Sequence, residues 1–97
     1  MIRIQYRYSD NICFLLLSGH AGYDNPGRDI VCAGVSALTY ALINLLDEQN
    51  PDGYEREIRP DETRIQFPCD GTTEKFILTG YRMMQDHYPG YVELKKI

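Results

Sequence analysis

Several features are scarce in this chain, and each absence argues against a class of protein. Only 3 of the 97 residues are cysteine, an odd number, and no two of them have C-x-x-C spacing. This pattern fits neither a disulfide framework nor a standard zinc site. We therefore expect at least one free thiol, and we expect neither a metal site nor a cofactor.

Basic residues are also few. The chain has 10 Lys and Arg against 14 Asp and Glu, which gives a formal net charge of -4. Direct binding to nucleic acid requires a dense basic surface, so we do not expect it here. A basic protein partner is compatible with this charge.

Long hydrophobic runs are missing as well. Met1 to Gln5 alternate instead of forming the apolar region of a secretory signal. The apolar run Ile12–Leu17 is far shorter than the ~20 residues that a membrane span needs. These observations predict a cytoplasmic protein that does not enter a membrane.

The composition that is present suits one globular domain spanning residues 1–97, with 43% hydrophobic and 25% charged residues. Alternation over residues 2–7 predicts an edge strand or a half-exposed strand, and the continuous apolar run over residues 12–17 predicts a fully buried central strand. Turn-forming residues at positions 9–11 join the two strands in a hairpin.

A long, mostly buried helix is predicted from Asp29 to a point near Asn50, where Pro51 disfavours helical geometry. Its expected apolar stripe is Val31, Val35, Leu38, Leu42 and Leu45, with small residues for close packing at Ala33, Ala37 and Ala41.

The second half repeats this order loosely. Short strands are predicted over residues 54–58 and 65–67, followed by a helix capped by Asp70 or Thr72 that ends before Pro89, and then by a final strand over residues 91–94. The resulting ββαββαβ order predicts an α+β fold in which a mostly antiparallel sheet packs with two helices.

Cys32 is the best candidate for a nucleophile. It falls in the first turn of the predicted helix, where unpaired backbone N–H groups and the positive end of the helix dipole favour a thiolate. His20 lies just across a glycine-containing loop, and folding could bring its imidazole within the ~2.6 to 3.2 Å that proton transfer requires. The two residues could form a Cys-His dyad, with the amides of Cys32 and Ala33 as candidate oxyanion donors.

Each of these residues also has a purely structural interpretation. Free cysteine is among the most buried residue types, so Cys32 could belong to the core. Asp29 could orient the imidazole or simply cap the helix. Ser36 lies one turn beyond Cys32 and could support the site or bond back to the preceding turn.

The segment Gly19-His20-Ala21-Gly22-Tyr23, followed by Asp29-Ile30-Val31-Cys32-Ala33-Gly34-Val35-Ser36-Ala37-Leu38, resembles the signature of the ribosomal-processing cysteine protease family, Prp. The closing segment over residues 80–92 resembles the family's last helix and strand. The likeness spans essentially the whole chain in order and length.

This resemblance implies a cysteine endopeptidase that removes the N-terminal extension of a large-subunit ribosomal protein, with His20 and Cys32 as the catalytic pair. It also implies a homodimer and a mobile loop over the cleft. Asp29 and Ser36 fall on motif positions of less secure role, and the substrate loop would include Gly19, Gly22, Tyr23 and Gly27.

Two hypotheses from other classes stay open on the sequence. The first is a non-catalytic, ribosome-associated module for peptide binding or assembly, in which Cys32 would be unreactive. The second is a redox sensor that uses Cys32, although no resolving cysteine lies beside it in the sequence.

Overall fold

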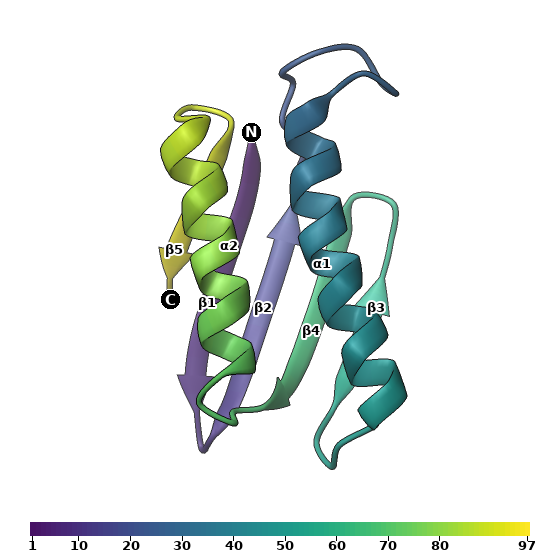
Figure 1. The fold of residues 1–97 in the computed structure, drawn as a ribbon, viewed down its shortest axis with the longest axis vertical. Helices are drawn as coiled ribbons and strands as arrows, with labels where there is room; N and C mark the ends of the chain where they lie inside the picture. The colour runs from purple at the N-terminus through teal and green to yellow at the C-terminus, as the bar shows by residue number, and fades with distance from the viewer.

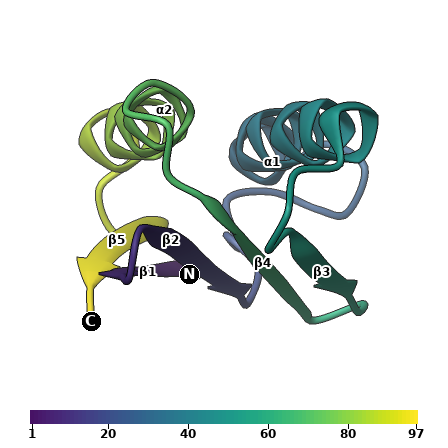
Figure 2. The same cartoon turned by 90° about the horizontal axis from the view of Figure 1, so that it is seen from below.

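Two helices lie side by side on one face of a five-stranded sheet in the computed structural model, which describes residues 1–97 (Figure 1, Figure 2). The elements in chain order are β1 Ile2–Ser9, β2 Ile12–Ser18, α1 Ile30–Gln49, β3 Glu55–Ile58, β4 Glu62–Pro68, α2 Thr73–His87 and β5 Val92–Lys96. This confirms the predicted ββαββαβ order and the α+β fold in a single domain.

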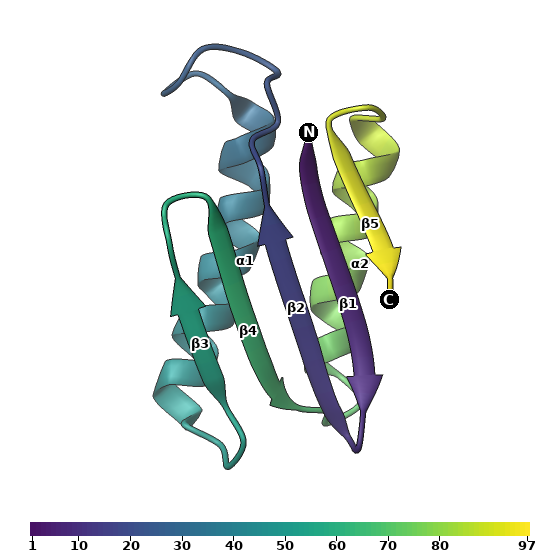
Figure 3. The same ribbon diagram turned by 180° about the vertical axis from the view of Figure 1, so that it is seen from behind.

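The strand order in the sheet is β3-β4-β2-β1-β5, so the first hairpin occupies its middle. Three of the strand pairs are antiparallel, and β5 joins β1 in parallel. The two ends of the chain are thereby held together, because β5 lies directly beside the N-terminal strand (Figure 3). The predicted mostly antiparallel sheet is confirmed.

The prediction of a fully buried β2 was wrong, because the sheet has helices on one face only. Cys13, Leu15 and Leu17 point to the helices and are buried, whereas the alternate side chains Ile12, Phe14 and Leu16 are only partly covered. An apolar run is therefore compatible with a half-open strand when the outer face carries hydrophobic side chains too.

Helix α1 begins and ends where the sequence predicts. Asn50 closes it in a left-handed conformation, with φ of 43°, and Pro51 follows. The buried stripe differs slightly from the predicted one, since Leu46 is buried and Leu45 is 39% exposed. By length and apolar composition α1 would also suit a membrane span. Its buried side chains face the protein core, as expected for the core helix of a globular domain.

The predicted alanines do not mediate the close packing of the helices, since all three are exposed. Glycines do so instead. A Cβ on Gly34 would lie 2.6 Å from Met84 Cε, and a Cβ on Gly80 would lie 2.9 Å from a methyl group of Leu38. Both helices therefore approach each other through positions that lack a side chain.

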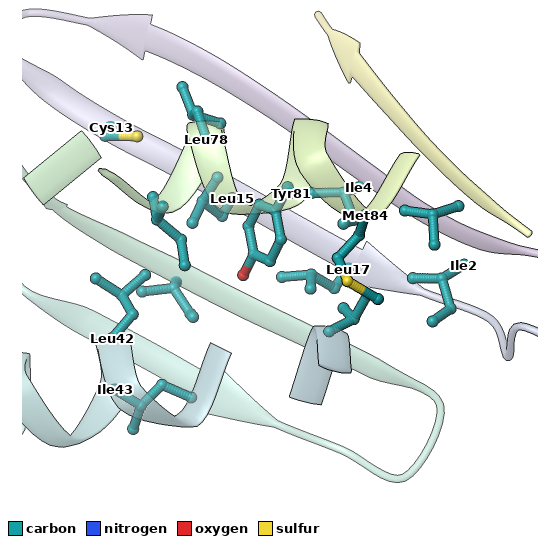
Figure 4. Close-up of a cluster of buried hydrophobic side chains, with 14 of the residues drawn as sticks. Ile2, Ile4, Cys13, Leu15, Leu17, Leu42, Ile43, Leu78, Tyr81 and Met84 are labelled. Carbon is teal, nitrogen blue, oxygen red and sulfur yellow. The ribbon is translucent and has the colours of Figure 1, made fainter. Parts of the chain in front are cut away.

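A buried polar contact fixes the two helices to each other. Tyr81 lies within the core, where its hydroxyl points toward α1 (Figure 4). It lies 2.8 Å from Thr39 Oγ1, which in turn donates to the carbonyl oxygen of Val35. These two hydrogen bonds give every buried polar side-chain atom of Thr39 and Tyr81 a partner. They also set the register of α2 against α1.

Candidate active site

Cys32 is the third residue of α1, as the sequence predicts. Its side chain is partly buried and lines a cavity of about 160 Å³. The backbone N–H of Ala21 donates a hydrogen bond to Cys32 Sγ over 3.3 Å. A donor at this distance stabilises negative charge on the sulfur.

His20 precedes Ala21 in the loop between β2 and α1 and lines the same cavity as Cys32. Its side chain is exposed, and no hydrogen bond joins it to Cys32 in this structure. Hydrogen bonds between catalytic groups are often long in the absence of substrate and tighten in the complex. The fold thus brings the two predicted residues to one cavity, with the residue next to His20 touching the sulfur.

Asp29 is the N-cap of α1. One carboxylate oxygen accepts 3.0 Å hydrogen bonds from the amides of Val31 and Cys32, and the other accepts from the amides of Tyr23 and Asp24. These bonds, chiefly the one from the Cys32 amide, hold the pKa of Asp29 below its ordinary value of 3.8. Both oxygens are committed to backbone amides, so the capping interpretation is the one that this geometry supports.

The amides predicted as oxyanion donors are also engaged. The N–H of Cys32 donates to the Asp29 carboxylate, and the N–H of Ala33 donates to the Asp29 carbonyl oxygen over 3.0 Å. Neither is free to receive an oxyanion in this conformation, so that expectation does not hold here. The N–H of Ala21 is the amide that donates to Cys32 Sγ instead.

Ser36 also lines the cavity, one turn after Cys32. Its hydroxyl makes no bond back to the preceding turn, whereas Thr39 does so to Val35. Gly19 lines the cavity with His20, while Gly22, Tyr23 and Gly27 lie outside it.

Part of the cavity wall comes from a segment that the sequence did not connect with the site. The turn between β3 and β4 contributes Arg59, Pro60 and Asp61, followed by Glu62 and Thr63 of β4. In the sequence these residues give only a turn signal. Their place at the site follows from the pairing of β4 with β2, in which Glu62 lies opposite Ser18.

No group of three or more His, Cys, Asp or Glu side chains in the structure could hold a metal ion. The cavity brings together a thiol, an imidazole and several hydroxyl groups, and its lining also includes the charged side chains of Arg59, Asp61 and Glu62. A thiol beside a histidine is the arrangement used for nucleophilic attack on a carbonyl.

Comparison with known families decides between the hypotheses that the sequence left open. Residues 1–93 match the model of a family described as cysteine protease Prp. The chain belongs to the Prp family of cysteine proteases. This match favours a hydrolase over a binding module or a redox sensor. No curated protein matches the sequence.

Solved structures show that the Prp fold extends over the whole chain. A crystal structure of an essential ribosomal processing protease Prp from S. aureus, with a covalently linked product peptide, has a TM-score of 0.81 at 19% identity and full coverage of both chains. SMU.848 from Streptococcus mutans has a TM-score of 0.69 at 24% identity, covering 100% of this chain and 94% of that one. At these identities the likeness establishes the fold of this Prp protease.

Proposed function

We propose that this cysteine protease removes the N-terminal extension of a large-subunit ribosomal protein, with Cys32 as the nucleophile and His20 as the general base. The observation that carries the proposal is that both residues line one cavity, with the amide of Ala21 on the sulfur. The substrate class is supported by similarity to an S. aureus ribosomal processing protease, which has also been crystallised with a substrate peptide.

The chemistry proceeds in two steps. His20 accepts the proton of the Cys32 thiol, and the thiolate attacks the scissile carbonyl. The protonated imidazole then gives its proton to the leaving amine, which breaks the peptide bond and leaves a thioester on Cys32. Water, deprotonated by His20, hydrolyses that thioester and restores the thiol.

We propose that the substrate peptide binds at this cavity. The cavity is bounded by the loop that carries His20, by α1 and by the turn between β3 and β4. An extended peptide crossing this cavity would pass over the sulfur between the two loops. We propose that the β3–β4 turn contributes to substrate selection, because its residues line the same cavity as His20 and Cys32.

The decisive experiment is incubation of the wild-type protein and Cys32→Ala with a panel of N-terminal peptides from ribosomal proteins, followed by mass spectrometry. We expect one peptide class to be cut at a single bond by the wild type, with Cys32→Ala and His20→Ala reducing turnover by at least about 10³-fold.

Cys69→Ala is the matched control, because Cys69 is also partly buried and lies outside this cavity. It should cut at the wild-type rate. Cleavage by folded Cys32→Ala would overturn the assignment of the nucleophile, and cleavage only of unrelated peptides would overturn the substrate class.

We also propose that the protein acts as a homodimer in the cytoplasm. The partly uncovered side chains Ile12, Phe14 and Leu16 on the open face of the sheet are compatible with association. Light scattering coupled to size-exclusion chromatography tests the dimer, and a monomer at micromolar concentration would contradict it. Fractionation of cells that express the protein tests its location.

A further inference from the structure

The loop between β2 and α1 is held more firmly at its start than along its later residues. It lies at the same end of the molecule as the turn between α2 and β5 (Figure 1). Its first residues make contacts with three other parts of the chain, whereas the following residues are exposed and bonded mainly among themselves. The part that carries His20 is therefore the anchored part.

Tyr23 makes the most extensive of these contacts. Its ring packs edge-on against Tyr88 at 5.6 Å between centroids and against Tyr91 at 5.1 Å. Such T-shaped pairs are favourable beyond the area that they bury. At the same time the backbone N–H of Tyr23 donates to Asp29 over 3.0 Å. One residue thus joins the loop to two separate elements.

The two tyrosines that contact the Tyr23 ring, Tyr88 and Tyr91, are themselves held by backbone hydrogen bonds. Tyr88 closes α2 by donating from its amide to the carbonyl oxygen of Met84 over 3.0 Å, and the amide of Tyr91 donates to the carbonyl oxygen of Tyr88. The carbonyl oxygen of Tyr91 accepts from Ile2 at the start of β1 over 2.9 Å. The aromatic surface for Tyr23 is therefore part of the sheet and helix framework.

Between Gly19 and Tyr23 little freedom remains. Gly19 has φ of +83°, and a Cβ there would collide with the carbonyl oxygen of Met1. Ala21 is 3% exposed, and its amide lies on Cys32 Sγ. His20 thus sits between two fixed residues, with only its side chain free in solvent.

We propose that Tyr23 is a positioning residue of the protease: its ring on Tyr88 and Tyr91, together with the Asp29 carboxylate, holds residues 19–23 so that the Ala21 amide stays on the Cys32 sulfur and His20 stays at the cavity. We call these four residues, Tyr23, Asp29, Tyr88 and Tyr91, the loop clamp. The catalytic part of the inference rests on the proposed roles of His20 and Cys32. Motion of the loop is then confined to residues 24–28.

The first test compares Tyr23→Ala with Tyr23→Phe, since the phenylalanine ring preserves the edge-on contacts. We expect Tyr23→Ala to lower kcat about ten- to hundredfold with KM nearly unchanged, because the change displaces catalytic groups and removes no substrate contact. Tyr23→Phe should recover most of the activity. Tyr8→Ala is the control, because Tyr8 is equally exposed, at 41% against 42%, and makes its edge-on contact with Tyr6 instead.

Alkylation of Cys32 by limiting iodoacetamide at neutral pH gives a readout that requires no substrate. We expect Tyr23→Ala to slow this alkylation about tenfold through loss of the Ala21 hydrogen bond, while Tyr23→Phe and Tyr8→Ala keep the wild-type rate. Equal rates in all four proteins would overturn the inference. Absence of peptide cleavage by the wild type would reject the proposed function and leave this measurement valid for the clamp.

The substitution Asp29→Asn tests the role of the carboxylate in holding the loop separately from its role in capping α1. Asparagine caps helices as well as aspartate does, so its oxygen can keep the amides of Val31 and Cys32. Its NH₂ group would then face the amides of Tyr23 and Asp24. Because all of these groups are hydrogen-bond donors, the two hydrogen bonds to the loop would be lost. Hydrogen exchange should accelerate at Ala21 and Tyr23 and stay slow along α1. Unchanged exchange in the loop, with α1 intact, would show that the carboxylate does not hold it.

Discussion

The three cysteines differ in what surrounds each sulfur. Cys13 is fully buried under the helices, and burial raises the pKa of its thiol to about 12. Burial, followed by the charges of Glu74 and Asp70, also raises the pKa of the Cys69 thiol above 9.0. Only Cys32 has a backbone donor on its sulfur, at the start of a helix. The three sulfurs therefore lie in different local environments.

We predict that limiting iodoacetamide at pH 7 modifies Cys32 before the other two, because thiolate is the reactive species and the raised pKa values leave little of it at Cys13 and Cys69. Peptide mapping by mass spectrometry measures the order of modification. In Cys32→Ser total labelling should fall sharply. Modification of Cys69 first would contradict the assignment of Cys32 as the activated thiol.

At the scale of the element, the start of α2 is capped by a residue that does not directly precede the helix. The residue directly before α2, Thr72, makes no side-chain cap. Asp70 does so instead, accepting hydrogen bonds from the amides of Thr72 and Thr73 and from the Thr73 hydroxyl. Glu74 reciprocates by accepting from the amides of Asp70 and Gly71. The two carboxylates satisfy the backbone at this helix start.

We predict that Asp70→Ala destabilises the protein by about 1 kcal/mol at pH 7, the usual effect of losing a helix cap. Hydrogen bonds from the Thr73 hydroxyl, the Thr73 amide and the Thr72 amide lower the pKa of Asp70 from 3.8 to about 2. A lowered pKa gives stability above pH 3.8 that is lost as the pH falls toward 2, so the difference between wild type and variant should narrow over that range.

Urea unfolding at several pH values between 7 and 2.5 measures this difference. Asp86→Ala is the matched control, because Asp86 is exposed on the same helix and forms no hydrogen bond or ion pair. It should not lower stability. If the difference in free energy of unfolding between wild type and Asp70→Ala stays constant down to pH 2.5, the proposed role of the Asp70 carboxylate as a helix cap is wrong.

At the scale of the whole molecule, the sheet and its two helices share one core on a single side (Figure 2). That core contains two groups that must remain neutral, the Cys13 thiol and the Tyr81 phenol, both with 0% exposure. Burial raises the pKa of Cys13 from 9.0 to about 12 and raises that of Tyr81 well above 10.0. Each can ionise more easily in the unfolded chain than in the folded one.

We therefore predict that stability declines as the pH rises from 9 to 10.5. A raised pKa contributes stability that is complete below the unfolded value and is lost above it, at up to about 1.4 kcal/mol per pH unit for each group. Urea unfolding at pH 7.5 and 10.5 measures the decline.

Tyr81→Phe should be less stable than wild type by about 1 kcal/mol at neutral pH, because it loses the hydrogen bond to Thr39. It should also lose less stability at alkaline pH, since one of the two ionising groups is gone. Equal stability of the wild type at both pH values would contradict this account.

Local sequence patterns determined the elements and their order. Turn residues beside alternating or helical runs fixed where each strand and helix lies, and Pro51 after Asn50 fixed the end of α1. The same patterns placed Cys32 in a helical first turn and His20 at the end of a strand. These features depend on neighbours in the chain, so the sequence states them directly.

Only the tertiary structure decided which segments meet. The pairing of β2 with β4 brings the Arg59–Asp61 turn to the cavity, and the pairing of β5 with β1 brings Tyr91 to Tyr23. It also decided that the Asp29 carboxylate serves backbone amides and that Ala21 meets the sulfur. Such contacts join residues that are distant in sequence, and they arise only when the packing of one shared core selects a single strand order and a single helix register.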